Sequence, residues 1–169
     1  MRFSLIDRIV SLRPGEELVA IKNLTLAEEY LGDHFPRFPV MPGVLMLEAM
    51  TQAAAWLVRV TDDFQHTMVV LREARGVKYG QFVEPGQTLT VTVKVTNHDA
   101  RFTTVRAQGR LEDRTTVGAR LTLERYNLAD LDDSPGNRAL DASLKDDLLK
   151  LFHILCPQEV AESAGVAIG

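Results

Sequence analysis

The chain has 169 residues, 46% of them hydrophobic, and a formal net charge of −4. This length and composition suit one domain with a sizeable core and exclude a disordered tail. An acidic chain has no overall attraction to phosphate backbones, so we expect no nucleic-acid partner.

Strands are predicted at the N-terminus and again before and after a Pro-Gly turn. Residues 3–10 and 17–25 are expected to form two strands joined around residues 13–16 (RPGE). A further strand is expected around residues 68–79. Pro85 and Gly86 then occupy the central positions that a type II turn favours, which leads the chain to a strand beginning at Thr88.

Three successive segments alternate between apolar and polar residues. Residues 88–96 (TLTVTVKVT) place leucine and valines on one face and threonines and lysine on the other, which is typical of a half-buried strand. The same period continues over residues 102–111 and again from Thr116. Because NHDA and EDRT between them have turn composition, the three segments predict an antiparallel meander.

One long helix is predicted to begin at Pro42-Gly43 and to continue over residues 44–60. It is apolar almost all round, which indicates a buried helix. A buried helix against five or six antiparallel strands makes this an α+β domain, which we assign to residues 1–126.

Residues 127–169 differ in character from the rest. NLADLDDSPGNR has the composition of a linker, and the last nine residues (AESAGVAIG) are expected to be loose. Between them, an amphipathic helix is predicted, with Ser143 as its cap and Pro157 at its end. Its apolar face, which we expect to be docked against the domain, consists of Leu144, Leu148, Leu151, Phe152 and Leu155.

Location and metal binding are constrained by what the sequence lacks. No apolar run reaches the length of a membrane span, and the N-terminus does not fit a signal peptide. The single cysteine, Cys156, suits a reducing compartment, so we expect a cytoplasmic protein. His66, His98 and His153 have no partner at metal-ligand spacing; we expect them at the surface and predict no metal site.

A proline-rich loop precedes the long helix and contains a histidine. In HFPRFPVMPGV, prolines recur every third residue and restrict the backbone. Stiffening of the connection is by itself a sufficient explanation for these prolines. A loop histidine is most often only a polar surface residue. A stiff loop nevertheless reduces the freedom of His34 and suits a general base, a common role of imidazole near neutral pH.

The helix itself contains one carboxylate, Glu48. A buried carboxylate costs several kcal/mol unless it is paired, hydrogen-bonded or protonated. Thr51 and Gln52 lie on the same stripe of the helix, so Gln52 can orient Glu48. An apolar surrounding favours the protonated carboxyl, which suits a general acid. The amide of Gly43, at the helix N-terminus, can bind an oxygen that becomes negative.

Base, acid and oxyanion donor together are what α-proton removal next to a thioester and loss of a β-hydroxyl require. The pattern HFPxxPxMPGVLxLEAMxQ resembles the 3-hydroxyacyl-(acyl carrier protein) dehydratases of the hot-dog fold, and three weaker matches extend the resemblance over about residues 3–126. The matching residues are His34, Phe35, Pro36, Pro39, Pro42, Gly43, Glu48 and Gln52. The resemblance implies a sheet wrapped around one central helix, two subunits whose sheets pair edge to edge, and active sites at the dimer interface.

The resemblance also implies roles for individual residues. His34 abstracts the α-proton, Glu48 protonates the departing hydroxyl, and the amide of Gly43 binds the thioester oxygen. Phe35, Pro42 and Gln52 support them. A glutamate as the acid resembles the branch that only dehydrates, whereas the branch that also isomerises the double bond usually has aspartate.

The substrate implied is carried on the phosphopantetheine of acyl carrier protein or coenzyme A, with no further cofactor. Arg72, Arg75 and Lys78 are candidates for docking an acidic carrier, and a solvated strand face explains them equally well.

Asp33, Arg37 and Gly80-Gln81 depart from the family pattern, which bears on carrier docking and substrate length. A hot-dog acyl thioesterase and a non-catalytic acyl-binding module are the alternative functions.

Overall fold

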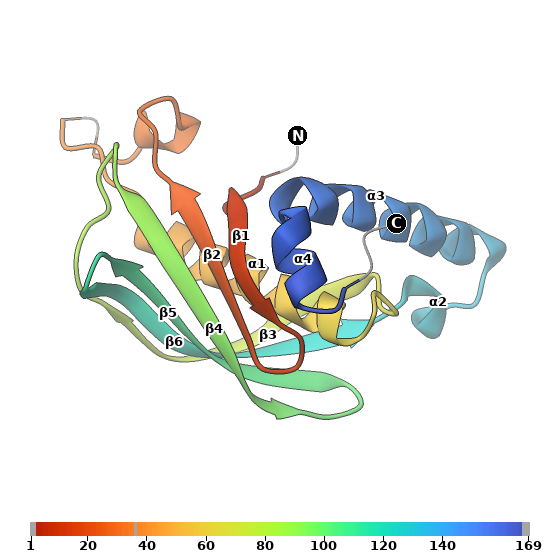
Figure 1. The fold of residues 1–169 in the computed structure, drawn as a ribbon. Helices are drawn as coiled ribbons and strands as arrows, with labels where there is room; N and C mark the ends of the chain where they lie inside the picture. Colours follow the sequence, from red (N-terminus) through yellow and green to blue (C-terminus); the bar gives the residue numbers. More distant parts are fainter. Residues whose placement is uncertain (1–2, 36, 167–169) are drawn as a thin grey trace.

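The computed structural model describes residues 3–35 and 37–166 (Figure 1). Their strands form one antiparallel sheet in the order β1-β2-β4-β5-β6-β3. The strands are β1 (Arg8–Arg13), β2 (Glu17–Asn23), β3 (Met68–Tyr79), β4 (Thr88–His98), β5 (Phe102–Leu111) and β6 (Arg114–Tyr126). The sheet curves around the long helix α1 (Gly43–Thr61), which confirms the predicted α+β hot-dog architecture.

The predicted meander is present as β4, β5 and β6, and β3 pairs with β6 rather than with β4, which follows it in the chain. The turn before β4 has the expected form: the amide of Gln87 donates to the carbonyl of Glu84 at 3.1 Å, and Gly86 has a φ of 90°. A φ of this sign is the reason that a type II turn favours glycine at this position.

The first strand is present, but its predicted bounds of residues 3–10 are wrong, because β1 begins at Arg8 and continues to Arg13. The backbone that precedes β1 is hydrogen-bonded to the side chain of Gln52 on α1. Its Oε1 accepts from the amide of Leu5 at 2.8 Å, and its Nε2 donates to the carbonyl of Phe3 at 3.0 Å. Phe3 and Leu5 therefore bond to the helix, and pairing with β2 starts only at Asp7, whose amide donates to the carbonyl of Ile21 at 2.9 Å.

Helix α1 lies where the sequence predicts it, and the sheet buries most of its length. Alanines at positions 49, 53 and 54 are buried, so the helix approaches the sheet closely. A short 3-10 helix, η1 (Glu29–Leu31), precedes the proline-rich loop. No helix among residues 3–35 and 37–166 is long and apolar enough to cross a membrane.

The C-terminal segment is more helical than predicted. It contains α2 (Leu128–Leu131), α3 (Pro135–Leu155) and α4 (Gln158–Ser163), so both the linker and the loose tail are partly wrong as predictions. Helix α3 begins about two turns earlier than predicted because Ser134, not Ser143, is its N-cap. The hydroxyl of Ser134 accepts from the amide of Asn137 at 3.2 Å, and Pro135 suits the first turn of a helix. The expected end before Pro157 is present, and residues 167–169 lie outside the described residues.

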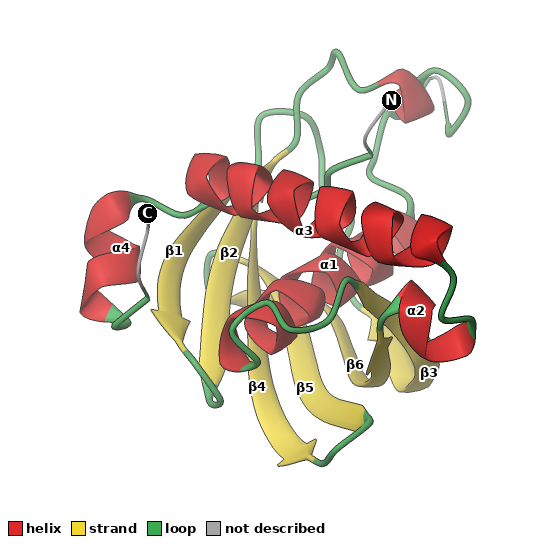
Figure 2. Ribbon diagram, turned by 90° about the vertical axis from the view of Figure 1, so that its right-hand side faces the viewer, coloured by secondary structure: helices red, strands yellow, loops and turns green. Residues whose placement is uncertain are grey.

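Helix α3 crosses α1 on the side away from the sheet (Figure 2). Phe152 is 1% exposed, and its ring centroid lies 6.0 Å from that of Trp56 and 5.4 Å from that of Phe64. The predicted docking of the apolar face is therefore confirmed. The division of the chain at residue 126 stays a prediction.

Candidate active site

His34 and Gly43 line one small cavity at the beginning of α1. The cavity has a volume of about 160 Å³ and is lined by His34, Met41, Gly43, Met46, Tyr79, Gly80, Gln81 and Phe82. The chain reaches it through an anchored loop, because the amide of Met41 donates to the carbonyl of Val83 at 2.9 Å. The residues predicted as general base and oxyanion donor thus line the same cavity.

The loop that holds His34 has an unusual backbone conformation. Phe35 has a φ of 51°, which non-glycine residues rarely adopt, and its carbonyl accepts from the amide of Phe38 at 2.7 Å. The rings of His34 and Phe35 lie 4.4 Å apart. Such outliers are typical of functional loops that their surroundings hold in place. Pro36, part of the matching pattern, lies outside the described residues.

The amide of Gly43 is the first of α1 and has no acceptor among the described residues. Pro42 precedes it as the N-cap, and its carbonyl accepts from the amides of Leu45 and Met46. A Cβ at position 43 would lie 2.9 Å from a ring carbon of Tyr79, so a side chain here would displace that ring. Glycine therefore keeps the amide accessible beside the histidine.

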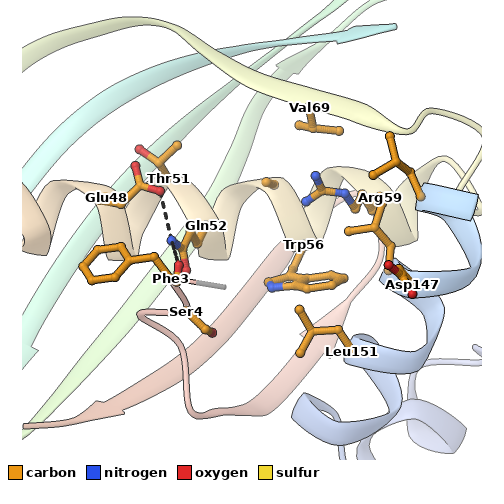
Figure 3. Close-up of a pocket in the computed structure, with 13 residues that line it drawn as sticks. Phe3, Ser4, Glu48, Thr51, Gln52, Trp56, Arg59, Val69, Asp147 and Leu151 are labelled. Atoms are coloured by element: carbon orange, nitrogen blue, oxygen red, sulfur yellow. Dashed lines mark hydrogen bonds between the residues drawn. The ribbon is translucent and has the colours of Figure 1, made fainter. Parts of the chain in front are cut away.

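Glu48 lines a second and larger cavity, between α1 and α3 (Figure 3). Its volume is about 430 Å³, and Thr51 and Gln52 line it too, as their shared stripe predicts. The Nε2 of Gln52 donates to Oε1 of Glu48 at 2.9 Å, whereas the hydroxyl of Thr51 donates to the carbonyl of Leu47. Because Gln52 is also bonded to Leu5 and Phe3, it fixes the carboxylate relative to the N-terminal segment.

The structure therefore brings the predicted residues together in two pairs: His34 with Gly43, and Glu48 with Gln52. Within this one chain, the histidine and the glutamate line different cavities.

The family model for the FabA-like domain matches residues 1–120. The chain belongs to this family. It is 38% identical over 127 residues to the 3-hydroxyacyl-[acyl-carrier-protein] dehydratase FabZ of Variovorax paradoxus, with 72% of this chain and 79% of that protein covered. The FabZ of Lactobacillus helveticus is 35% identical over 116 residues, with 69% and 78% covered. The resemblance stated from the sequence is thereby confirmed.

Among solved structures, the chain resembles the dehydratase heterocomplex ApeI:P from Xenorhabdus doucetiae. The TM-score is 0.63 at 16% identity, with 75% of this chain and 86% of that chain covered. This likeness shows the fold. The FabA-like family thus accounts for the sheet and α1, whereas α3 and α4 follow the matched residues.

The basic residues suggested for carrier docking differ in their surroundings. Arg72 pairs with Glu124 at 3.4 Å and Arg75 with Glu73 at 2.8 Å. A hollow of about 600 Å³ on the sheet is lined by Arg75, Gly76, Lys78, Arg106, Ala107, Gln108, Thr115, Gly118, Ala119 and Arg120. Sequence reasoning missed its two further arginines, although the alternation of the meander places both on the solvent face.

Two of the histidines expected at the surface lie around one carboxylate. His98 lies 3.2 Å and His66 3.5 Å from Asp62, and Nε of Arg125 lies 2.9 Å from the same side chain. His98 is exposed, as expected, whereas His66 is half-buried. Among the residues that the structure describes, no group of three or more potential ligands could hold a metal ion.

Gly80, one of the departures from the family pattern, is expected to be sensitive to substitution. Its amide donates to the carbonyl of Thr116 at 2.7 Å, and a Cβ would lie 2.6 Å from the carbonyl oxygen of Thr115. Gly80→Ala must separate two backbones, so we expect a loss of about 1–3 kcal/mol in unfolding free energy. Denaturant titration measures it, with Gly136→Ala, which has room for a methyl group, as control. Equal midpoints for the two variants would contradict the prediction.

Proposed function

We propose that this chain removes water from 3-hydroxyacyl thioesters to give trans-2-enoyl thioesters. His34 takes the proton from C2, the double bond forms as the C3–O bond breaks, and Glu48 gives its proton to the hydroxyl, which leaves as water. The amide of Gly43 donates to the thioester oxygen as negative charge develops there. The observation that carries this proposal is the shared cavity of His34 and Gly43 in a chain of the FabA-like family.

One assay with the purified chain and a 3-hydroxyacyl thioester tests the proposal. A rise in absorbance from the conjugated enoyl thioester, without release of free thiol, is the expected result. Release of free thiol would instead establish a thioesterase. Neither signal, with a thioester that binds, would leave an acyl-binding module. The last two results each contradict the proposal.

The proposal includes a two-fold dimer in which His34 of one chain meets Glu48 of the other. The two cavities of one chain each supply half of the required groups. Around the His34 cavity, an apolar surface is exposed to solvent, and it consists of Phe35, Phe38, Val44, Tyr79 and Phe82. An exposed apolar surface of this kind is typical of a protein interface.

The free edge of the sheet supports the same arrangement. Strand β3 has β6 on one side and, among the described residues, no strand on the other. An unpaired edge of twelve residues is a template for pairing with a second chain. Tyr79, at the end of β3, belongs to the apolar surface around the His34 cavity. Pairing of two β3 strands would therefore bring the two apolar surfaces into the interface region.

The thioester carrier in this proposal is acyl carrier protein, the substrate carrier in the names of the FabZ relatives. Three arginines oppose one another across neighbouring strands, because Arg120 on β6 lies opposite both Arg106 on β5 and Arg75 on β3. Like charges directly opposite destabilise a sheet. An acidic partner would offset this repulsion, and Lys78 lines the same hollow. No cofactor enters the scheme, and a cytoplasmic location belongs to the same proposal.

Reversing the charge of this surface is expected to weaken the use of carrier-linked substrate selectively. Arg120→Glu should raise KM for the substrate on acyl carrier protein and leave KM for the coenzyme A thioester nearly unchanged, since only the carrier protein covers the hollow. The effect should shrink as salt is added. Lys150→Glu, an exposed change on α3, is the control. Equal changes in KM for both substrates would contradict docking at the arginines.

A further inference from the structure

The Glu48 cavity has a cation on the same stripe of α1 as the acid. Glu48, Gln52, Ala55 and Arg59 follow one another at helical spacings of four, three and four residues, so they share one face. All four line the cavity. The backbone positions of Glu48 and Arg59 are about 16 Å apart along the axis, at 1.5 Å per residue. The cavity therefore extends from a carboxyl group toward a guanidinium.

Between these two groups the wall is apolar and comes from three elements. It consists of Ala55, Trp56, Val69, Leu144, Leu148 and Leu151. The leucines belong to α3, which lies beyond the residues matched by the FabA-like domain. Such a wall suits the methylenes of an acyl chain. The small side chain of Ala55 leaves room in the middle of the stripe.

Arg59 has no anionic partner within the described residues. Its Nε is buried without a hydrogen-bond partner, and its Cζ lies 5.3 Å from the centre of the Trp56 ring. Figure 3 shows the guanidinium between Trp56 and Val69, directed into the cavity. Burial lowers the pKa of Arg59 to about 10, so it is charged at neutral pH. Asp147 of α3 also lines the cavity.

A position in the last turn of α1 does not by itself explain this arrangement. A cation near a helix C-terminus interacts favourably with the helix dipole, and an exposed arginine would do so equally well. Burial without a partner is instead unfavourable, because a desolvated charge loses its hydration. The cost is offset when a ligand brings the missing acceptor.

We propose that the Glu48 cavity takes an acyl chain whose far end is a carboxylate, and that Arg59 binds this carboxylate. The inference rests on the proposed function, in which Glu48 acts on the C3 hydroxyl. A carboxylate is the planar anion that a linear acyl chain can carry at its end, and it matches the donor fork of a guanidinium. Arg59 is then a specificity-determining residue that selects dicarboxylic acyl thioesters over simple fatty acyl thioesters.

The test compares two series of 3-hydroxyacyl thioesters of equal chain lengths, one ending in a methyl group and one in a carboxylate. The readout is the ratio of kcat/KM for the carboxylate-ended to the methyl-ended substrate, at each length. The proteins are wild type, Arg59→Met, Arg59→Lys and the control Lys145→Met, which removes an exposed cation of α3 that does not line the cavity. Arg59→Gln replaces Arg59→Met if the latter does not fold.

Wild type is expected to prefer the carboxylate-ended substrate at one or more lengths. Arg59→Met should lower the ratio by about ten- to a hundredfold, as expected for the loss of a hydrogen-bonded charge. Arg59→Lys should keep part of the preference, and Lys145→Met all of it.

A wild-type preference for the methyl-ended series at every length would overturn the inference and leave the dehydratase function intact. The inference also fails if the ratio is the same in wild type and Arg59→Met. Dehydration of neither series would overturn the proposed function, and the inference with it.

Discussion

His34→Ala and Glu48→Gln are each expected to lower kcat/KM for dehydration by about 10²–10⁴-fold, the usual contribution of a general acid or base. Glu48→Gln keeps the shape of the side chain beside Gln52 and removes only the proton to be donated. The assay is formation of enoyl thioester, with circular dichroism to verify folding. His153→Ala, an exposed histidine on α3, is the control and should retain wild-type activity.

The two variants also separate the alternative functions. In a thioesterase, the helix carboxylate would activate water, so Glu48→Gln would abolish release of free thiol. In a binding module, neither substitution would change a reaction rate. Wild-type dehydration by either variant would remove that residue from the proposed mechanism.

Phe152→Ala is expected to lower the free energy of unfolding by about 3–5 kcal/mol, as large-to-small changes of buried aromatic residues do. The ring is buried against Trp56 of α1 and against Phe64, so its loss leaves a cavity between α3 and the domain. Ile154→Ala, two residues away and 78% exposed, is the matched control and should change stability little. Denaturant titration gives both values. Similar small losses for the two would mean that α3 is not docked in solution.

Loosening α3 should also alter substrate choice, because its leucines form part of the wall of the Glu48 cavity. Deletion after Tyr126 is the stronger form of the change. We expect the truncated chain to melt at lower temperature and to lose its chain-length preference. Unchanged melting temperature, oligomeric state and preference would exclude a role of the C-terminal helices in the site.

The sequence was informative where local periodicity determines structure. Alternation over residues 88–96 and 102–111 predicted β4 and β5, and Pro42-Gly43 predicted the beginning of α1. The i, i+4 spacing of Glu48 and Gln52 predicted that they could interact, and the structure shows their hydrogen bond.

Errors arose where a distant side chain or a neighbouring cap determines the outcome. Residues 3–7 were expected to belong to the first strand, but Gln52 of α1 bonds to the backbone of Phe3 and Leu5. Ser134 caps α3 well before Leu144, where the apolar face that predicted this helix begins. The separation of His34 from Glu48 into two cavities and the unpaired charge of Arg59 depend on tertiary packing, for which the sequence contains no periodic signal.

Mixing the His34→Ala and Glu48→Gln chains, by co-expression or refolding, tests most directly whether each site is divided between two subunits. In a two-fold dimer, every mixed pair would have one site with both groups and one with neither. Random mixing at equal amounts makes about half of the dimers mixed, so about a quarter of wild-type activity should return. Activity that stays at the level of the single variants, with mixed dimers shown to have formed, would contradict the shared site.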